Sequence, residues 1–188
     1  NYISSRNISL EFPGSRGIGF IRRVPIDQET YFVTKARLEM GNDFNIKQFA
    51  PHEQDRFVVL YIEPAINNLQ AIGLDIGSEK TRRIAAVDAM RFGKAVITAP
   101  ITLVQLSDKT QQSFLLLVPI YRSWVTPDTE KKRTEECVGW AFSPLWMQEV
   151  LVNLPTDPEL FYINLKDTAE EDSSSFFSND QNFSSNQA

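Results

Sequence analysis

The pattern of apolar and polar positions along the chain predicts a series of strands interrupted by two long helices. Stretches that alternate apolar and polar side chains are typical of half-buried strands, and short continuous apolar stretches are typical of fully buried ones. Such stretches lie at residues 17–24, 44–49, 58–62, 95–98, 101–106, 113–121, 138–142 and 160–165. The polar residues 107–110 suit a hairpin turn, so the strands on either side of them are predicted to pair antiparallel.

Apolar residues at helical spacing predict one helix over residues 25–40 and a second over residues 79–92, and a glycine follows each of them. Ser78 is the expected N-cap of the second helix. The apolar side chains expected on the buried face of this helix are Ile84, Val87 and Met90.

The second half of the chain is more polar between its predicted strands. Residues 127–133 carry many charges and no apolar period, so a solvated loop is expected there. A short amphipathic helix is predicted to begin at Pro144. Residues 169–188 are rich in Asp, Glu, Ser and Asn, and we expect a weakly ordered tail unless its phenylalanines dock elsewhere.

This order of elements predicts an α+β fold, in which a curved antiparallel sheet takes helices on one face and forms a cup. Small ligands usually bind in concave sites with apolar walls. We therefore expect a ligand to lie between the sheet and the helix at residues 79–92.

Composition excludes several kinds of function. The formal net charge of −5 gives no general attraction to phosphate backbones, so nucleic acid is not an expected partner. The only cysteine, Cys137, cannot form an intrachain disulfide, and a zinc site would need more Cys and His ligands than the chain has. We expect no metal and no cofactor. The only histidine, His52, lies in a polar segment and is expected to be a solvated loop residue.

Five short motifs stand in order along the chain: GFIRRVP at 19–25, YIEP at 61–64, GLD at 73–75, GKAVITAPI at 93–101 and LLLVPIY at 115–121. Together they resemble the CHASE domain, the extracytoplasmic sensor module of histidine kinases, diguanylate cyclases and related receptors. The segment GWAF at 139–142 extends the resemblance to about residue 154.

The resemblance implies a PAS-like curved antiparallel sheet with flanking helices, in a membrane-distal and a membrane-proximal lobe. On this basis residues 1–16 are the end of a stalk or linker, 17–136 the distal ligand-binding lobe, 137–168 part of the proximal lobe, and 169–188 the tail. Membrane spans would lie outside this sequence, with the domain facing the periplasm or cell exterior from the inner membrane. The full receptor is expected to form a homodimer through its stalk helices.

Plant members of the family bind adenine-type cytokinins through an aspartate early in the helix after the Leu-Asp segment. The matching position here is Arg82, and a cation cannot accept the purine N–H bonds that a carboxylate accepts. Arg82 would instead favour a carboxylate or phosphate, as a bidentate partner, unless it is a solvated arginine on the helix surface. The other positions that match the plant pocket are Ile76, Thr98, Val104 and Leu117. Asp75 either contacts the ligand or caps nearby backbone N–H groups.

The predicted function is reception of an unknown small molecule, with an anion favoured by Arg82, and without catalysis by this part of the receptor. The alternative is a protein-interaction module that binds a periplasmic partner and no small molecule. A hydrolase would have to use His52 or a carboxylate, and we expect none.

Overall fold

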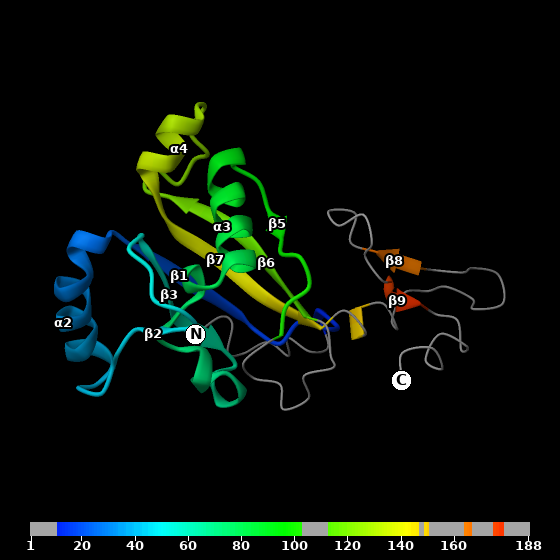
Figure 1. The fold of residues 1–188 in the computed structure, drawn as a ribbon, viewed down its shortest axis with the longest axis horizontal. Helices are drawn as coiled ribbons and strands as arrows, with labels where there is room; N and C mark the ends of the chain where they lie inside the picture. Colours follow the sequence, from blue (N-terminus) through cyan, green and yellow to red (C-terminus); the bar gives the residue numbers. More distant parts are fainter. Residues whose placement is uncertain (1–10, 103–112, 147–148, 151–163, 167–174, 179–188) are drawn as a thin grey trace.

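The computed structural model of the chain describes residues 11–102, 113–146, 149–150, 164–166 and 175–178. Seven strands form one sheet in the order β2-β4-β3-β1-β7-β6-β5 (Figure 1). Their bounds are Ile18–Val24 (β1), Lys47–Gln48 (β2), Arg56–Glu63 (β3), Leu74–Asp75 (β4), Val96–Ile97 (β5), Ser113–Tyr121 (β6) and Cys137–Trp146 (β7). The pairing is antiparallel except between β2 and β4. Two further strands, β8 (Asn164–Lys166) and β9 (Ser175–Ser178), form a separate antiparallel pair.

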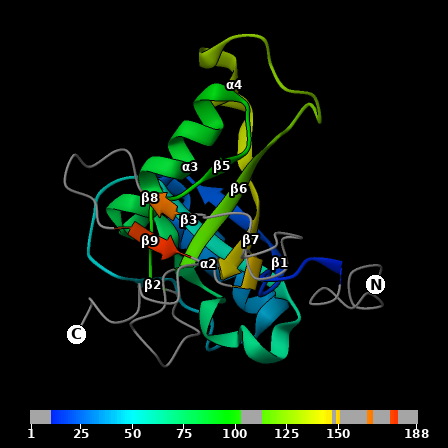
Figure 2. The ribbon, with the colours of Figure 1, turned by 90° about the vertical axis from the view of Figure 1, so that its right-hand side faces the viewer.

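Helix α3 (Lys80–Phe92) lies across one face of the large sheet (Figure 1). Helix α4 (Glu130–Glu136) stands at the C-terminal end of α3, where the Nε of Arg133 donates a hydrogen bond to the carbonyl oxygen of Arg91 (Figure 2). Helix α2 (Glu29–Met40) follows a single 3₁₀ turn, η1 (Ile26–Gln28). Three more 3₁₀ turns lie between β3 and α3, namely η2 (Ala65–Asn67), η3 (Leu69–Ala71) and η4 (Ile76–Ser78).

The core consists of two clusters of buried apolar side chains, one for each face of β3. Phe57 and Val59 belong to the larger cluster beneath α3. Val58, which points to the opposite face, joins Ala36 of α2 in the smaller one. The expectation that the helices would share one face of the sheet is therefore wrong for α2.

The space between α3 and the sheet is filled by side chains. Trp140 of β7 is 0% exposed, and its indole N–H donates to the carbonyl oxygen of Ala86 at 2.9 Å. The helix presents small residues to the sheet, Ala85, Ala86 and Ala89, so that its backbone approaches closely and the large aromatic ring fits beneath it. Side chains therefore occupy the space beneath the alanines of α3, and the expected ligand position between helix and sheet stays a prediction.

The strands predicted at 17–24, 58–62, 113–121 and 138–142 are confirmed as parts of β1, β3, β6 and β7, and the α+β class is confirmed with them. Both long helices are confirmed with their stops, and Gly93 has the left-handed conformation, with φ of 67°, that a helix C-cap favours. The segments 103–106 and 160–163 lie outside the described residues. The division into distal and proximal lobes stays a prediction.

Several local predictions are wrong. The charged segment 127–133 contains the start of α4, where Thr129 caps the helix and Arg91 of α3 pairs with Glu130 at 2.6 Å. The strand at 44–49 is reduced to the two residues of β2. Residues 144–146 continue β7 because they pair with β6, so no helix begins at Pro144.

The N-cap of α3 and its buried face also differ from the prediction. Glu79, and not Ser78, caps the helix, and Ile84 is 50% exposed because the alanines occupy the face toward the sheet. In the C-terminal tail, residues 175–178 form β9, so this part is a strand.

Candidate functional site

The most buried charge in the described structure is the carboxylate of Asp75, which is 0% exposed at the end of β4. Its Oδ1 accepts hydrogen bonds from the backbone N–H of Phe57 at 2.8 Å and of Gly77 at 2.9 Å. The first bond ties Asp75 to β3, and the second caps the 3₁₀ turn η4. Of the two roles left open for Asp75, the structure therefore shows the capping of backbone N–H groups.

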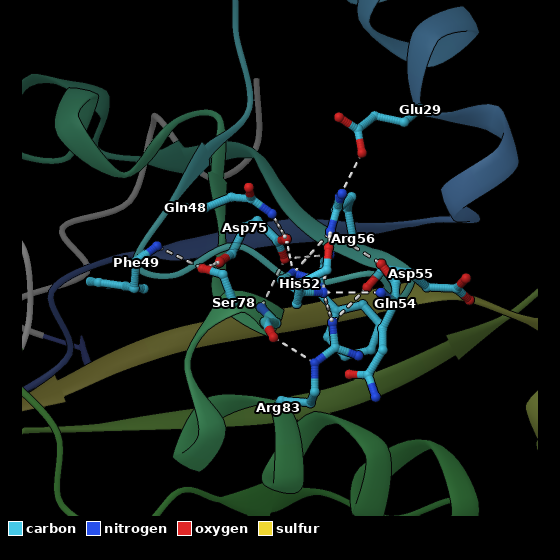
Figure 3. Close-up of polar contacts among 12 residues, drawn as sticks. Glu29, Gln48, Phe49, His52, Gln54, Asp55, Arg56, Asp75, Ser78 and Arg83 are labelled. Carbon is cyan, nitrogen blue, oxygen red and sulfur yellow. Dashed lines mark hydrogen bonds and ion pairs between the residues drawn. The ribbon is translucent and has the colours of Figure 1, made fainter.

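His52 contacts the other oxygen of this carboxylate (Figure 3). Its Nε2 lies 2.7 Å from Oδ2 of Asp75, and its side chain is only 15% exposed. Because Nδ1 accepts from the backbone N–H of Gln54 at 3.2 Å, Nε2 carries the hydrogen that is donated to Asp75. The expectation of a solvated loop histidine is wrong, since the fold brings in a partner 23 positions away in sequence.

Two arginines enclose the His52–Asp75 pair, and each is already engaged. Arg56 donates to Glu29 of α2 at 2.6 Å and to the carbonyl oxygen of His52 at 2.5 Å. Arg83 of α3 donates to the carbonyl oxygen of Asp55 at 2.6 Å and lies over the ring of Phe57. The network therefore joins α2, β3, β4 and α3, and its contacts hold these elements together.

This network has a histidine and a carboxylate, but the hydroxyl group near them, that of Ser78, is not activated as a nucleophile. The nearby Ser78 donates its hydroxyl hydrogen to the carbonyl oxygen of Asp75 at 2.6 Å and accepts from the N–H of Phe49 at 2.8 Å. Its hydroxyl thus serves two backbone groups and is not directed at His52. Within the described residues, no three His, Cys, Asp or Glu side chains are grouped as metal ligands.

Arg82 is the predicted ligand residue with the most unusual surroundings. It lies on the first turn of α3 and is only 5% exposed, so the alternative of a solvated surface arginine is wrong. Its Nη1 lies 3.0 Å from Oε2 of Glu79, and its Nη2 donates to the carbonyl oxygen of Thr102 at 2.6 Å. The guanidinium also lies over the ring of Phe49, 4.6 Å from its centroid. Burial lowers the pKa of Arg82, against the opposing effect of Glu79.

Glu79 neutralises Arg82 and caps α3 with the same carboxylate. Its oxygens accept from the backbone N–H of Thr81 at 2.8 Å and of Arg82 at 3.0 Å. Burial raises the pKa of Glu79, but these backbone hydrogen bonds and the charge of Arg82 outweigh it, so the pKa is lowered overall. The first turn of α3 is thus an anion-binding position that holds one of the chain's own carboxylates.

Three of the remaining predicted site residues are buried. Ile76 and Leu117, 2% and 0% exposed, belong to the same apolar cluster beneath α3. Thr98, which is 3% exposed, follows β5, and its Oγ1 accepts from the N–H of Leu115 at 3.0 Å. Val104 lies outside the described residues. The carboxylate of Asp75 contacts His52, whereas Arg82 contacts Glu79 and Thr102.

Sequence reasoning found Arg82 but missed its partner Glu79, as well as His52. The signal for Glu79 was present, because a carboxylate three residues before an arginine at a helix start can both cap the helix and pair with the side chain. No short-range signal links His52 to Asp75.

Comparison with known proteins identifies the type of domain. No curated protein matches the chain significantly in sequence. No helix among the described residues has the length and apolar character needed to cross a bilayer. Residues 1–177 match the CHASE domain family, whose members are non-catalytic sensor domains on the extracytoplasmic side of membrane receptors. Since the match covers all but the last 11 of the 188 residues, the chain belongs to the CHASE domain family.

Proposed function

We propose that this domain is the small-molecule sensor of a transmembrane histidine kinase or diguanylate cyclase, and that its ligand binds at the first turn of α3. Membership of the CHASE family supports a sensory role. The position of the site rests on Arg82, a guanidinium that is 5% exposed. Its carboxylate partner, Glu79, is nearer the surface, with 28% of its side chain exposed, and can therefore be exchanged for an anion from solution.

In this proposal a carboxylate or phosphate of the ligand replaces the carboxylate of Glu79. The incoming group would meet the donors that now bind Glu79, namely the Arg82 guanidinium and the backbone N–H groups of the first turn of α3. Thr98, Ile76, Val104 and Leu117 would complete the site, with Asp75 holding η4 in place behind it. Thr98 contributes a hydroxyl hydrogen that is donated to no other described residue.

Displacement of Glu79 gives the ligand a way to alter the fold. Glu79 links the α3 N-terminus to Arg82, and Arg82 links α3 to the segment after β5 through Thr102. A ligand that binds better when Glu79 is released shifts the domain toward that arrangement, whereas equal affinity for both arrangements would shift nothing. In the full receptor the shift would pass through stalk helices of a homodimer to segments that cross the inner membrane.

A thermal-shift screen with small carboxylates, phosphates, amino acids and purines tests this proposal. A ligand at a hundredfold excess over its dissociation constant should stabilise the domain by about 2.7 kcal/mol. Glu79→Gln should bind an anionic hit more tightly, because the competing negative charge is gone, and Arg82→Gln should lose it. Lys80→Gln is the matched control: it removes an exposed cation from the same turn and should bind as the wild type does.

Two results would contradict the proposal. The first is a screen in which no compound shifts the unfolding temperature of the wild type. The second is an anionic hit whose affinity is the same in the wild type, Glu79→Gln and Arg82→Gln. Glu79→Gln keeps an oxygen that can cap α3, so the test does not depend on the folding of Arg82→Gln.

The filled space beneath α3 favours a second candidate function, a module that binds an extracytoplasmic partner protein. Trp140 packs against the alanines of α3 and occupies the space between them and β7. In that case the screen gives no hit, and a partner that cross-links to the purified domain is recovered instead.

A further inference from the structure

A separate hollow lies at the far end of the large sheet from Arg82. Its volume is about 310 Å³, and it lies where β1 ends, β6 ends and β7 begins. Arg23 in its wall contacts Met90, near the C-terminal end of α3, whereas Arg82 lies on the first turn of that helix. The hollow is therefore distinct from the ligand site proposed above.

The lining of this hollow is strongly cationic. Three arginines, Arg22, Arg23 and Arg122, line it against a single carboxylate, Glu135. The chain as a whole has a formal net charge of −5, so this gathering of guanidinium groups runs against its overall charge. Positive charges that line one hollow repel one another, and an anion bound there would reduce that repulsion.

The three arginines differ in how they are held. Arg23 is fixed, because it forms an ion pair with Asp55 at 2.9 Å and donates to the carbonyl oxygen of Thr134 at 2.5 Å. Arg22 and Arg122 are exposed, and the described residues offer neither guanidinium an ion pair or a hydrogen bond. The hollow thus has one rigid cationic wall and two guanidinium groups whose donors are available to a ligand.

Among the other polar groups around the hollow, Glu135 is the one that opposes an anion. Glu135 has its own cation in Lys131, 4.0 Å away along α4. Burial raises the pKa of the Cys137 thiol to about 11, so the thiol is neutral at physiological pH. Gln28 and Thr134 add an amide and a hydroxyl that can donate hydrogen bonds.

From this arrangement we infer that the hollow binds a small polyanion, in which two carboxylate or phosphate groups are held by Arg22 and Arg122. A guanidinium donates two parallel hydrogen bonds to either kind of group, so the shared chemistry is that of a planar or tetrahedral oxyanion. The volume admits a molecule of several heavy atoms in addition to a lone ion.

Titration of the purified domain with pyrophosphate and with citrate tests the inference and distinguishes the two sources of negative charge. Isothermal titration calorimetry at constant ionic strength should show saturable binding of one molecule per chain for at least one of them. Arg22→Gln/Arg122→Gln should weaken that binding by about a hundredfold, and Arg122→Gln alone by about tenfold. Acetate, with one carboxylate, should bind far more weakly than either.

The matched control is Lys35→Gln/Lys94→Gln, which removes two exposed positive charges from outside the hollow. It should bind the polyanion as the wild type does. A loss of binding in Arg82→Gln with retention in Arg22→Gln/Arg122→Gln would place the polyanion at α3 and overturn the inference. Binding that does not saturate, or that weakens equally in both double variants, would overturn it as well.

Discussion

Three charged side chains are buried among the described residues, and each has partners in another segment of the chain. Asp75 holds β3 and His52, Arg56 reaches α2 through Glu29, and Arg82 reaches the segment after β5. Removing one member of such a set leaves the others buried without a partner, which costs more than the net worth of the contact. Stability at this scale is therefore concentrated in a few polar residues.

Replacing Asp75 by alanine is expected to lower the free energy of unfolding by about 3 kcal/mol, because two backbone N–H groups and His52 lose their acceptor. His52→Ala should cost less, about 1 kcal/mol, since it leaves the backbone bonds of Asp75 intact. Urea denaturation of both variants measures the difference. An equal cost for the two would show that the backbone contacts of Asp75 contribute little.

Glu79→Gln is expected to destabilise the domain by about 1 kcal/mol at neutral pH, because the amide oxygen can still cap α3 but no longer brings a negative charge to Arg82. The pKa of Glu79 is lowered in the folded state, so its carboxylate stabilises the fold above the ordinary glutamate pKa. This stability is lost as the pH falls through the lowered pKa. Unfolding curves of wild type and variant should therefore converge in acid, and a constant difference down to pH 2 would contradict the assignment.

Strand β7 contributes to two interfaces between elements, one with β1 and one with α3. At the first interface Gly139 pairs opposite Arg22, and a Cβ at this position would overlap the carbonyl oxygen of Ile21. At the second, Trp140 donates to Ala86 beneath α3. Two neighbouring residues of β7, Gly139 and Trp140, therefore lie at both interfaces.

Gly139→Ala should destabilise the domain by about 3 kcal/mol or more, because the methyl group would force β1 and β7 apart in the middle of the sheet. Val138→Ala, at the half-buried position next to it, is the control and should cost about 1 kcal/mol. Thermal unfolding by circular dichroism gives both values. A Gly139→Ala variant as stable as the control would mean that this part of the sheet can shift to admit the methyl group.

Apolar periodicity was sufficient to predict β1, β3, β6, β7 and both long helices, because each of them buries a face in the core. It failed for α4, which has no buried residue and is held by the Thr129 cap and the Arg91–Glu130 ion pair. It also misplaced Ile84, because the buried face of α3 is made of Arg82, three alanines and Met90, of which only Met90 was predicted.

The candidate site was predictable only in part. The resemblance to the CHASE domain led to Arg82, which the structure shows to be buried, but the pairing of His52 with Asp75 depends on contacts across 23 residues. The hollow lined by Arg22 and Arg122 depends on strands that meet only in the folded sheet, so no pattern along the chain could indicate it.

Across the whole molecule, the two long helices differ in how firmly they are attached. Five residues of α3 are buried, whereas α2 buries only Ala36 and leaves Leu38 77% exposed. Local opening needs less free energy where fewer apolar contacts must be broken. Helix α3 is therefore firmly attached to the sheet, and helix α2 is attached more loosely.

Amide hydrogen exchange should reveal this difference. The amides of α2 are expected to exchange at least tenfold faster than those of α3, which corresponds to an opening free energy lower by about 1.4 kcal/mol or more. Arg56→Gln, which removes the ion pair with Glu29 of α2, should speed exchange in α2 but not in α3. Equal protection of the two helices would show that α2 has further support.

The central place of β1 has a mechanical consequence. Hydrogen-bond ladders join this strand to β3 along one edge and to β7 along the other. Sliding β1 lengthwise would load both ladders in shear at once, so its neighbours must travel with it. A force applied to residues 11–17, which precede the strand, is therefore transmitted to both halves of the sheet, and the two halves move together.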